Sequence, residues 1–495
     1  MKSGFGHKSG LGRYCFTVFS MLAAGICAAD DAILSRKTEA PQPARRYHYV
    51  NPPIPVRTAT ARQVAVPVKN PRELRLDLGT SSSAAWTLDQ VIAATLTSDP
   101  RLHIGKEEIR QAKAEHVSSS LIPNPEFSAA GGVLPFSRNR ITEDSPGGPP
   151  ELSLAVDFPI DWFLFAKRKA EMNNTKWEIR QAHAEYADLI RSRIMETAAL
   201  FYDVLEAKAL FAVANQEVEI LAQLEGIAKG GVEAGGMPVV ELKRITLDLL
   251  QIRQELLVSE KELDVLKAQL RAQFGCTDYD PEFDITGDLD AATDKDPMPL
   301  ETAFEMARLS RPDIRALLIN VSKSKANVHL EQRHAYPEIT AHTEYVRQYQ
   351  KASGDNDYNG WGIGVTVSVP LFDRNQGNRL KARSALTQST HQYQAGIADL
   401  RAEIVEADRN FRTAHQQVHT IAWEEVLLSA EVRDMMIAAF MTGGVPLIDV
   451  LDAERSYQET VRMFITSRAD YWRALYIYNS VVGINSANDI RADRH

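Results

Sequence analysis

Residues 397–435 read IADLRAEIVEADRNFRTAHQQVHTIAWEEVLLSAEVRDM, and apolar side chains recur in this stretch at alternating spacings of three and four. The recurring positions, interrupted only at Glu425, are Ile397, Leu400, Ile404, Ala407, Phe411, Ala414, Val418, Ile421, Leu428, Val432 and Met435. A shorter stripe, interrupted at Ser259, contains Leu249, Ile252, Leu256, Leu263, Leu266 and Leu270. Sustained 3–4 spacing is typical of the seam between supercoiled helices, so both stretches are predicted to be coiled-coil helices.

These helices are predicted to be long. No proline occurs between Lys167 and Lys229 or between Arg379 and Met441. At 1.5 Å per residue, each stretch could extend for about 90 Å. A soluble bundle with ordinary heptads is the simpler interpretation, but helices of this length exceed a compact domain. We therefore expect a tube or a stalk.

The chain contains one unit twice. The pairs that share an offset of 212 residues are Leu88 and Leu300, Pro100 and Pro312, Ala114 and Ala326, and Pro125-Glu126 and Pro337-Glu338. Farther along, Gly235-Gly236-Met237-Pro238 corresponds to Gly443-Gly444-Val445-Pro446. Each copy is expected to begin with one helix (88–120 and 300–334), followed by two strands and two long helices that meet at the Gly-Gly pair.

Each copy also has a segment that alternates between apolar and small or polar residues. These segments are ELSLAVDF at 151–158 and WGIGVTVSV at 361–369, with partner strands expected around 127–133 and 339–349. The pattern is typical of a transmembrane barrel strand, with lipid on one side and water on the other. A half-buried sheet in a soluble protein gives the same pattern and is favoured when this feature is taken alone.

The number of strands matters if they enter a membrane. Two strands per copy give four per chain, and four strands cannot close a barrel. Open sheet edges are not tolerated in lipid, so several chains would have to share one barrel. Three chains would supply twelve strands, and their long helices would continue below the barrel as a helical tube.

The N-terminus indicates export. Lys2, Lys8 and Arg13 precede an apolar stretch at 14–24, and small residues up to Ala29 offer a cleavage site. Acylation at Cys27 is the alternative, although Ile26 fits a lipoprotein signal poorly. After the signal there is no run of about 18 apolar residues, so no transmembrane helix is expected. The chain is predicted to be periplasmic, secreted or inserted in the outer membrane.

The charge balance and the motifs exclude other classes of protein. A formal net charge of -9 argues against a nucleic-acid partner, which requires a basic surface. Three cysteines leave no disulfide framework and no cysteine metal site. No H-E-x-x-H, P-loop, G-x-S-x-G or dinucleotide motif occurs, so no enzyme and no cofactor are expected.

The order of elements and two short motifs resemble the TolC family of outer-membrane efflux proteins. VPLFDRNQG at 369–377 is similar to the strand-to-helix turn of its heavy-metal branch, the CzcC and CusC relatives. TGGVPLIDVLDA at 442–453 is similar to the periplasmic helix tip of TolC. The resemblance covers about residues 86–483. It implies a mainly α chain with a small transmembrane β part, in a trimer that combines a shared twelve-stranded β-barrel with a long coiled-coil periplasmic tunnel.

The resemblance also implies a function and a division of the chain. The expected segments are a signal peptide (1–29), a Pro-rich extension (30–85), a first repeat (86–275), an acidic linker (276–298), a second repeat (299–483) and a tail (484–495). The expected function is a passive outer-membrane channel of a tripartite, RND-type efflux system for metal cations or small toxic compounds. Its partners would be two further copies of the same chain, which complete a homotrimer, together with outer-membrane lipid, a periplasmic adaptor (membrane fusion) protein and an inner-membrane pump. The alternative is a periplasmic coiled-coil adaptor or scaffold, against which the repeated hairpin and the alternating strands argue.

Two acidic and two apolar residues are candidates for the channel entrance. By resemblance, Asp449 and Asp452 would form rings of three carboxylates that concentrate cations, although Asp449 also suits the dipole at a helix N-terminus. Phe440 and Val445 occupy positions where one family member, TolC itself, has a polar gate made by a Tyr and an Arg. Neither can make those contacts, so a closed gate must be held differently or more loosely.

The helix tips and one turn complete the set of candidates. The proposed adaptor-docking residues, which otherwise serve only as helix turns, are Gly235, Gly236, Pro238, Gly443, Gly444 and Pro446. The glycines can take positive φ to end one helix, and the prolines suit the first turn of the next. At the strand-to-helix turn that contains Asp373, Pro370 would end strand pairing and Gly377 would permit the sharp turn.

One histidine pair has a chelating spacing. His415 and His419 are four residues apart on a predicted helix. No carboxylate or cysteine obviously adds a third ligand, so a surface pair without metal is expected.

Overall fold

The computed structural model describes residues 85–132, 150–278, 280–289, 297–350, 356–442 and 444–484, except for the side chains of 420–423 and 441. The predicted signal peptide with Cys27, nearly all of the Pro-rich extension, Gly443 and the tail after residue 484 lie outside the described residues. The chain divides into two units, residues 1–68 and 69–495, and the description below concerns the second.

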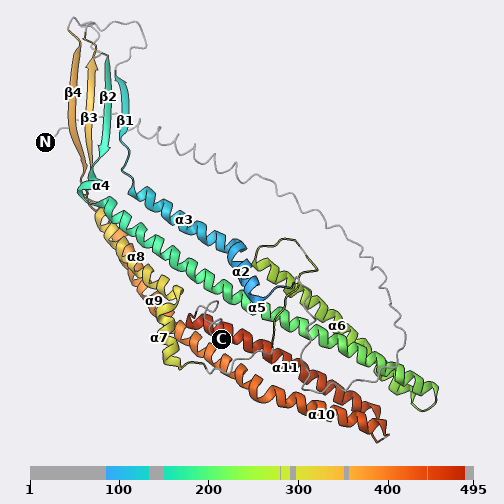
Figure 1. The fold of residues 1–495 in the computed structure, drawn as a ribbon. Coiled ribbons are helices and arrows are strands. Elements are labelled where there is room, and N and C mark those ends of the chain that lie inside the picture. The colour runs from blue at the N-terminus through green and yellow to red at the C-terminus, as the bar shows by residue number, and fades with distance from the viewer. Residues whose placement is uncertain are drawn as a thin grey trace, which may run out of the picture. The chain divides into compact units, whose positions relative to one another are not determined.

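The described part is predominantly helical with four strands, as predicted (Figure 1). Its first half contains α2 (Leu88–Ser98), α3 (Pro100–Ser120), β1 (Glu126–Gly132), β2 (Glu151–Pro159), α4 (Asp161–Leu164), α5 (Lys167–Glu233) and α6 (Val239–Gln273). Its second half contains α7 (Leu300–Ser310), α8 (Pro312–His334), β3 (Glu338–Gln348), β4 (Tyr358–Ser368), α9 (Gln376–Gln416), the π-helical turn η3 (Gln417–Ile421), α10 (Ala422–Met441) and α11 (Leu447–Val482). None of the described helices is both long and apolar enough to cross a membrane.

The four strands form one antiparallel sheet in the order β1-β2-β3-β4. Alternation places the apolar residues of β4 on one face, where Trp361 is 78% and Ile363 90% exposed. The opposite face of β4 carries Gly360, Gly362 and Gly364. The predicted strands are confirmed, and among the described residues both edge strands, β1 and β4, lack a neighbour on one side.

The long helices form two hairpins, α5 with α6, and α9 and α10 with α11. Helix α6 packs on α5, α5 packs on α11, and α11 packs on α10 (Figure 1). The main core between the hairpins includes Phe201, Leu205, Leu400, Ile465 and Tyr471, each at most 1% exposed. In this layer α6 and α10 are therefore the two lateral helices.

The first helix of each copy is broken, contrary to the prediction of continuous helices over 88–120 and 300–334. The chain leaves helical geometry at Asp99 (ψ 118°) and again at Arg311 (ψ 127°). A proline follows each of them, and the proline ring disfavours helical geometry in the preceding residue. Each break separates a short helix from a longer one, α2 from α3 and α7 from α8.

The heptad prediction is confirmed for α6 but is wrong beyond Val418. In α6, Leu249, Leu263 and Leu270 are buried. In α10, Leu428 is 63% exposed, whereas Val426, outside the predicted stripe, is 1% exposed. The π-helical turn η3 lies between α9 and α10, and its i→i+5 hydrogen bonds enclose one more residue than those of an α-helix do. The apolar stripe beyond it is therefore rotated out of the seam.

Candidate functional site: the paired helix tips

The first helix tip is closed by a left-handed glycine. Gly235 has φ +71°, and the Gly236 N–H donates to the Gly231 carbonyl at 2.9 Å. This six-to-one hydrogen bond is the Schellman C-cap. Pro238 then stands at the N-cap of α6 with φ -67°. The predicted positive φ therefore occurs at Gly235, and the proline lies one residue before the first turn of α6.

The second tip repeats this closure. The Gly444 N–H donates to the Ala439 carbonyl at 2.8 Å, and Pro446 is the N-cap of α11. Gly444 itself does not have positive φ, contrary to the expectation for this glycine. Gly235, Gly236, Pro238, Gly444 and Pro446 are all exposed in the single chain.

The two tips are joined by an apolar cluster, which we call the tip cluster. Its buried members are Leu221, Ala228, Ile245 and Leu249 from the first hairpin and Leu447, Val450 and Leu451 from the second. Phe440 and Val445 are partly buried and pack against it. The structure thus places these two residues in apolar contact between the hairpins, where a family member with Tyr and Arg would have polar groups.

The candidate entrance carboxylates lie on the exposed side of α11. Asp449 and Asp452 are exposed, whereas Val450 and Leu451 between them belong to the tip cluster. The Asp449 N–H donates to the Pro446 carbonyl at 3.2 Å, so this carboxylate lies in the first turn of α11, where the helix dipole favours it. Both carboxylates are free to face solvent or another chain.

Ion pairs above the tip cluster link α11 to the first hairpin. Arg462 Nη2 lies 2.7 Å from Glu217 Oε2 on α5 and 3.1 Å from Glu255 Oε2 on α6. Arg455 Nη2 lies 3.2 Å from Asp248 Oδ1 on α6. Burial, together with the neighbouring carboxylates, raises the pKa of Glu217 although Arg462 lowers it. Spacing in the sequence does not reveal these links, because the partners are more than 200 residues apart in the chain.

The turn from the sheet into α9 is made by Asn375, not by Gly377 as predicted. Asn375 has φ +57°, a conformation that asparagine tolerates better than most residues do. Its N–H donates to Asp373 Oδ1 at 2.9 Å, and its side-chain amide donates to Glu331 Oε2 at 2.7 Å. Gly377 is already helical, and no atom lies within 4 Å of the place a Cβ would take. β4 ends at Ser368, two residues before Pro370, so strand pairing stops just ahead of this proline.

The histidine pair lies at the π-helical turn. The rings of His415 and His419 are 4.3 Å apart between centroids, and both lie near the Tyr471 ring, at 6.0 and 6.3 Å. Within the described residues, no group of three or more His, Cys, Asp or Glu side chains is arranged to hold a metal ion.

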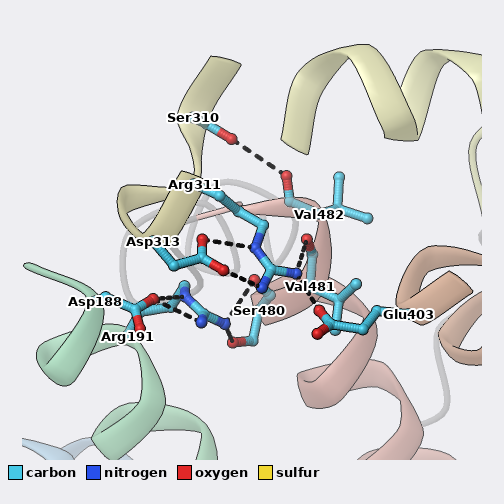
Figure 2. A network of polar contacts seen from close by, with 9 residues as sticks. All are labelled: Asp188, Arg191, Ser310, Arg311, Asp313, Glu403, Ser480, Val481 and Val482. Atoms are coloured by element: carbon cyan, nitrogen blue, oxygen red, sulfur yellow. Dashed lines mark hydrogen bonds and ion pairs between the residues drawn. The ribbon is translucent and has the colours of Figure 1, made fainter. Parts of the chain in front are cut away.

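A polar network that was not predicted lies where α7 meets α8, around the buried side chain of Arg311 (Figure 2). Arg311 donates to Asp313 through two hydrogen bonds of 3.0 and 2.6 Å, and to Glu403 of α9 at 2.5 Å. It also donates to the Val481 carbonyl, while Arg191 of α5 donates to the Ser480 hydroxyl at 3.0 Å. Two cations therefore complement the C-terminal end of α11.

The two copies use this junction with exchanged charges. In the first copy Asp99 pairs with Arg193 of α5 at 2.6 Å. In the second, Arg311 pairs with Glu403 of α9. Asp99 and Arg311 occupy the matched positions before the junction prolines. Opposite charges at matched positions were thus the sequence signal for this network.

The family model and two related proteins point to the same kind of protein. Residues 303–475 match the family model described as outer membrane efflux protein. The cobalt-zinc-cadmium resistance protein CzcC of Cupriavidus metallidurans is 24% identical over 382 residues, which cover 76% of this chain and 85% of that protein. The outer membrane protein TolC of Vibrio cholerae is 24% identical over 435 residues, which cover 83% and 94%.

A solved structure shows the same fold. The crystal structure of CusC superposes with a TM-score of 0.67 at 17% identity, covering 82% of this chain and 96% of that one. The predicted resemblance to the TolC-type outer-membrane efflux proteins is confirmed, and so is the outer membrane as the location.

Proposed function

Since residues 303–475 carry an outer-membrane efflux protein domain, we propose that the chain is the passive outer-membrane channel of a tripartite, RND-type efflux system. Two TolC-type repeats, 86–275 and 299–483, joined by the linker 276–298, would build each subunit. Energy would come from an inner-membrane pump, linked to the channel by a periplasmic adaptor. No catalytic group is needed for this role.

The unpartnered edges of the single chain are the observation that carries the proposal. Strands β1 and β4 are open edges, and such edges are not tolerated in lipid. The lateral helices bear large exposed apolar residues as well. These are Leu247, Leu250, Leu257 and Val258 on α6 and Leu428, Val432 and Met435 on α10. A ring of copies would cover both kinds of edge at once.

Three copies would close the ring. Four strands from each chain would give a twelve-stranded barrel, with the apolar face of Trp361 and Ile363 toward lipid and the glycine face toward water. The helical layers would meet through α10 of one copy and α6 of the next. Asp449 and Asp452 would then repeat around the axis as acidic rings at the entrance, which favour cations.

The exposed helix tips are the proposed docking points for the adaptor. Gly235, Gly236 and Pro238 of one tip and Gly444 and Pro446 of the other lie at the same end of the hairpins. Glycines without side chains leave the backbone accessible to a partner tip. Gly443 belongs to this proposal from its sequence position.

Metal cations are the proposed cargo, because CzcC is named for resistance to cobalt, zinc and cadmium. The test has two parts. Outer-membrane extracts should contain a trimer that forms conducting pores in planar bilayers, whereas release of the chain with the soluble periplasm would support the adaptor or scaffold alternative. A deletion strain should become sensitive to divalent metals. Unchanged sensitivity to every metal tested would contradict the cargo.

A further inference from the structure

A row of ionisable side chains crosses the polar face of the sheet. The strand register pairs Glu126 with Asp157, Asp157 with His342, and His342 with Gly364. His342 Nδ1 lies 2.8 Å from Asp157 Oδ1, and its Nε2 lies 3.8 Å from Glu344 Oε2. We call Glu126, Asp157, His342 and Glu344 the strand row.

The strand row is accessible from one side. Each of its three ion-paired side chains, Asp157, His342 and Glu344, is about one third exposed (34%, 32% and 35%). The neighbouring strand β4 offers only Gly362 and Gly364 at these levels, and a Cβ at Gly364 would reach no closer than 4.0 Å to the imidazole. Beside His342 there is therefore open space in place of another side chain.

No basic side chain on the strands offsets the strand row at this level. The other charged group on the same face of β3 is Glu338. Lys167, which lies beside the Pro337 carbonyl just before β3, is paired with Asp161 at 2.7 Å. The balance is thus acidic, with His342 as the one group near neutrality that can change it. Histidine is the side chain whose charge ordinarily changes between pH 5 and 8.

We propose that the strand row is a second selectivity element of the pore, formed inside the barrel and far along the chain from Asp449 and Asp452, and that His342 sets its strength. This inference rests on the proposed function, because only a closed barrel with the glycine face inward turns the strand row toward the conduit. Repeated in three copies, it forms a belt of carboxylates interleaved with imidazoles. The belt favours cations, and protonation of His342 weakens that preference.

Ionic strength decides how far such a belt acts. The Debye length is about 30 Å at 0.01 M salt, about 10 Å at 0.1 M and about 3 Å at 1 M. In a wide conduit the belt therefore acts on the whole cross-section only in dilute electrolyte. The cation preference due to the belt should be large at low salt and vanish near 1 M.

The experiment measures reversal potentials of the full-length channel in planar bilayers, with KCl gradients in the 0.01–0.1 M range. D157N/E344Q should at least halve the permeability ratio of K⁺ to Cl⁻. H342Q should keep the preference but lose its decrease between pH 7.5 and pH 5.5. D449N/D452N is the matched control, because it removes two carboxylates at the entrance and should leave the pH dependence intact.

The outcomes separate the two proposals. If the wild-type protein forms no pores, the proposed function and the inference fail together. If pores form but D157N/E344Q and H342Q behave as the wild type does at low salt, the inference alone is overturned. Should the double variant not insert, E126Q carries the same prediction with a smaller shift. H342E, which adds a carboxylate, should raise the cation preference.

Discussion

Asn375 connects the sheet to α9 in a left-handed conformation that costs most residues about 1–2 kcal/mol. Asparagine reduces this cost, and its amide also holds Glu331. We predict that Asn375→Val destabilises the protein by about 1–2 kcal/mol or more, since a β-branched side chain fits this conformation poorly and loses the hydrogen bonds.

Gly377→Ala is the matched control for this turn. Gly377 is helical with open space around it, so alanine there should stabilise the protein by about 0.5–1 kcal/mol. Thermal unfolding in detergent, followed by circular dichroism, compares the two variants. Loss of stability in Gly377→Ala would show that this glycine, and not Asn375, makes the turn.

The Arg311 network gives a prediction about acid stability. Burial raises the pKa of Asp313, but the hydrogen bonds and charge of Arg311 outweigh it, so the pKa is lowered below 3.8. A lowered pKa means that the carboxylate stabilises the fold above about pH 4 and that this contribution disappears as pH falls through the folded-state value. Asp313→Asn should therefore melt earlier at pH 7, and the difference from wild type should shrink toward pH 3.

Glu217 should behave in the opposite sense. Its raised pKa favours the protonated form in the fold, so its charge costs stability above the folded-state pKa and the cost is relieved on acidification. Glu217→Gln should accordingly be more stable than wild type at pH 8, and this difference should shrink at pH 4, where Glu217 is protonated. The expectation holds as long as Arg462 keeps Glu255 as a partner. A variant that is less stable than wild type at pH 8 would show that the ion pair with Arg462 outweighs burial.

At the scale of single residues, sequence identified positions better than roles. The tip glycines were found because the same four-residue pattern occurs twice, and Gly235 does take the left-handed conformation. Glycine is the usual residue at such a turn, so the sequence predicts it at Gly377, but Asn375 two positions earlier takes the left-handed conformation instead. Apart from Asp313, the partners of Arg311 are more than 90 positions away in the chain, and spacing alone does not bring them together.

At the scale of elements, η3 decides which face of α10 is free. The heptad pattern of Leu428, Val432 and Met435 continues that of α9, so nothing in the spacing shows that an extra residue per turn intervenes. The strands, in contrast, begin and end close to the predicted residues. Alternation with a period of two indicates a strand and not a helix. The spacing of apolar residues therefore predicts the type of element more securely than it predicts which face of a helix is buried after an irregular turn.

The rotation of the apolar stripe at η3 gives a prediction for α10. Val426 is buried in the core of the chain and Leu428 is exposed. Val426→Ala should therefore lower the stability of the subunit by about 1–3 kcal/mol. Leu428→Ser should leave the secondary structure intact but weaken association between copies, measured as the concentration at which the trimer dissociates in detergent. The reverse result would mean that the heptad pattern continues through η3, with Leu428 in the core of the chain and Val426 at the contact between copies.

At the scale of the whole molecule, the edges of the sheet and of the helical layer must close together. Strands β1 and β4 come from different repeats, and so do the lateral helices α6 and α10. A neighbour that pairs with β4 is therefore also the neighbour that covers α10, provided that the copies are related by one rotation. Closure by rotation gives a ring of fixed size, whereas a mismatch between the two edges would give an open filament.

Cross-linking tests this closure. Leu250 of α6 and Leu428 of α10 are 55% and 63% exposed. They lie at similar distances from the helix tips, about 17 and about 20 Å at 1.5 Å per residue.

With the exposed Cys276 changed to serine, L250C/L428C should be joined between copies by a short bismaleimide. Denaturing gels should then show bands of two and three chains and none larger, because a ring of three has only three such contacts. Each single-cysteine variant should remain monomeric on the same gels. A ladder beyond three chains would indicate an open assembly, and absence of cross-links in conducting preparations would place α6 and α10 away from each other.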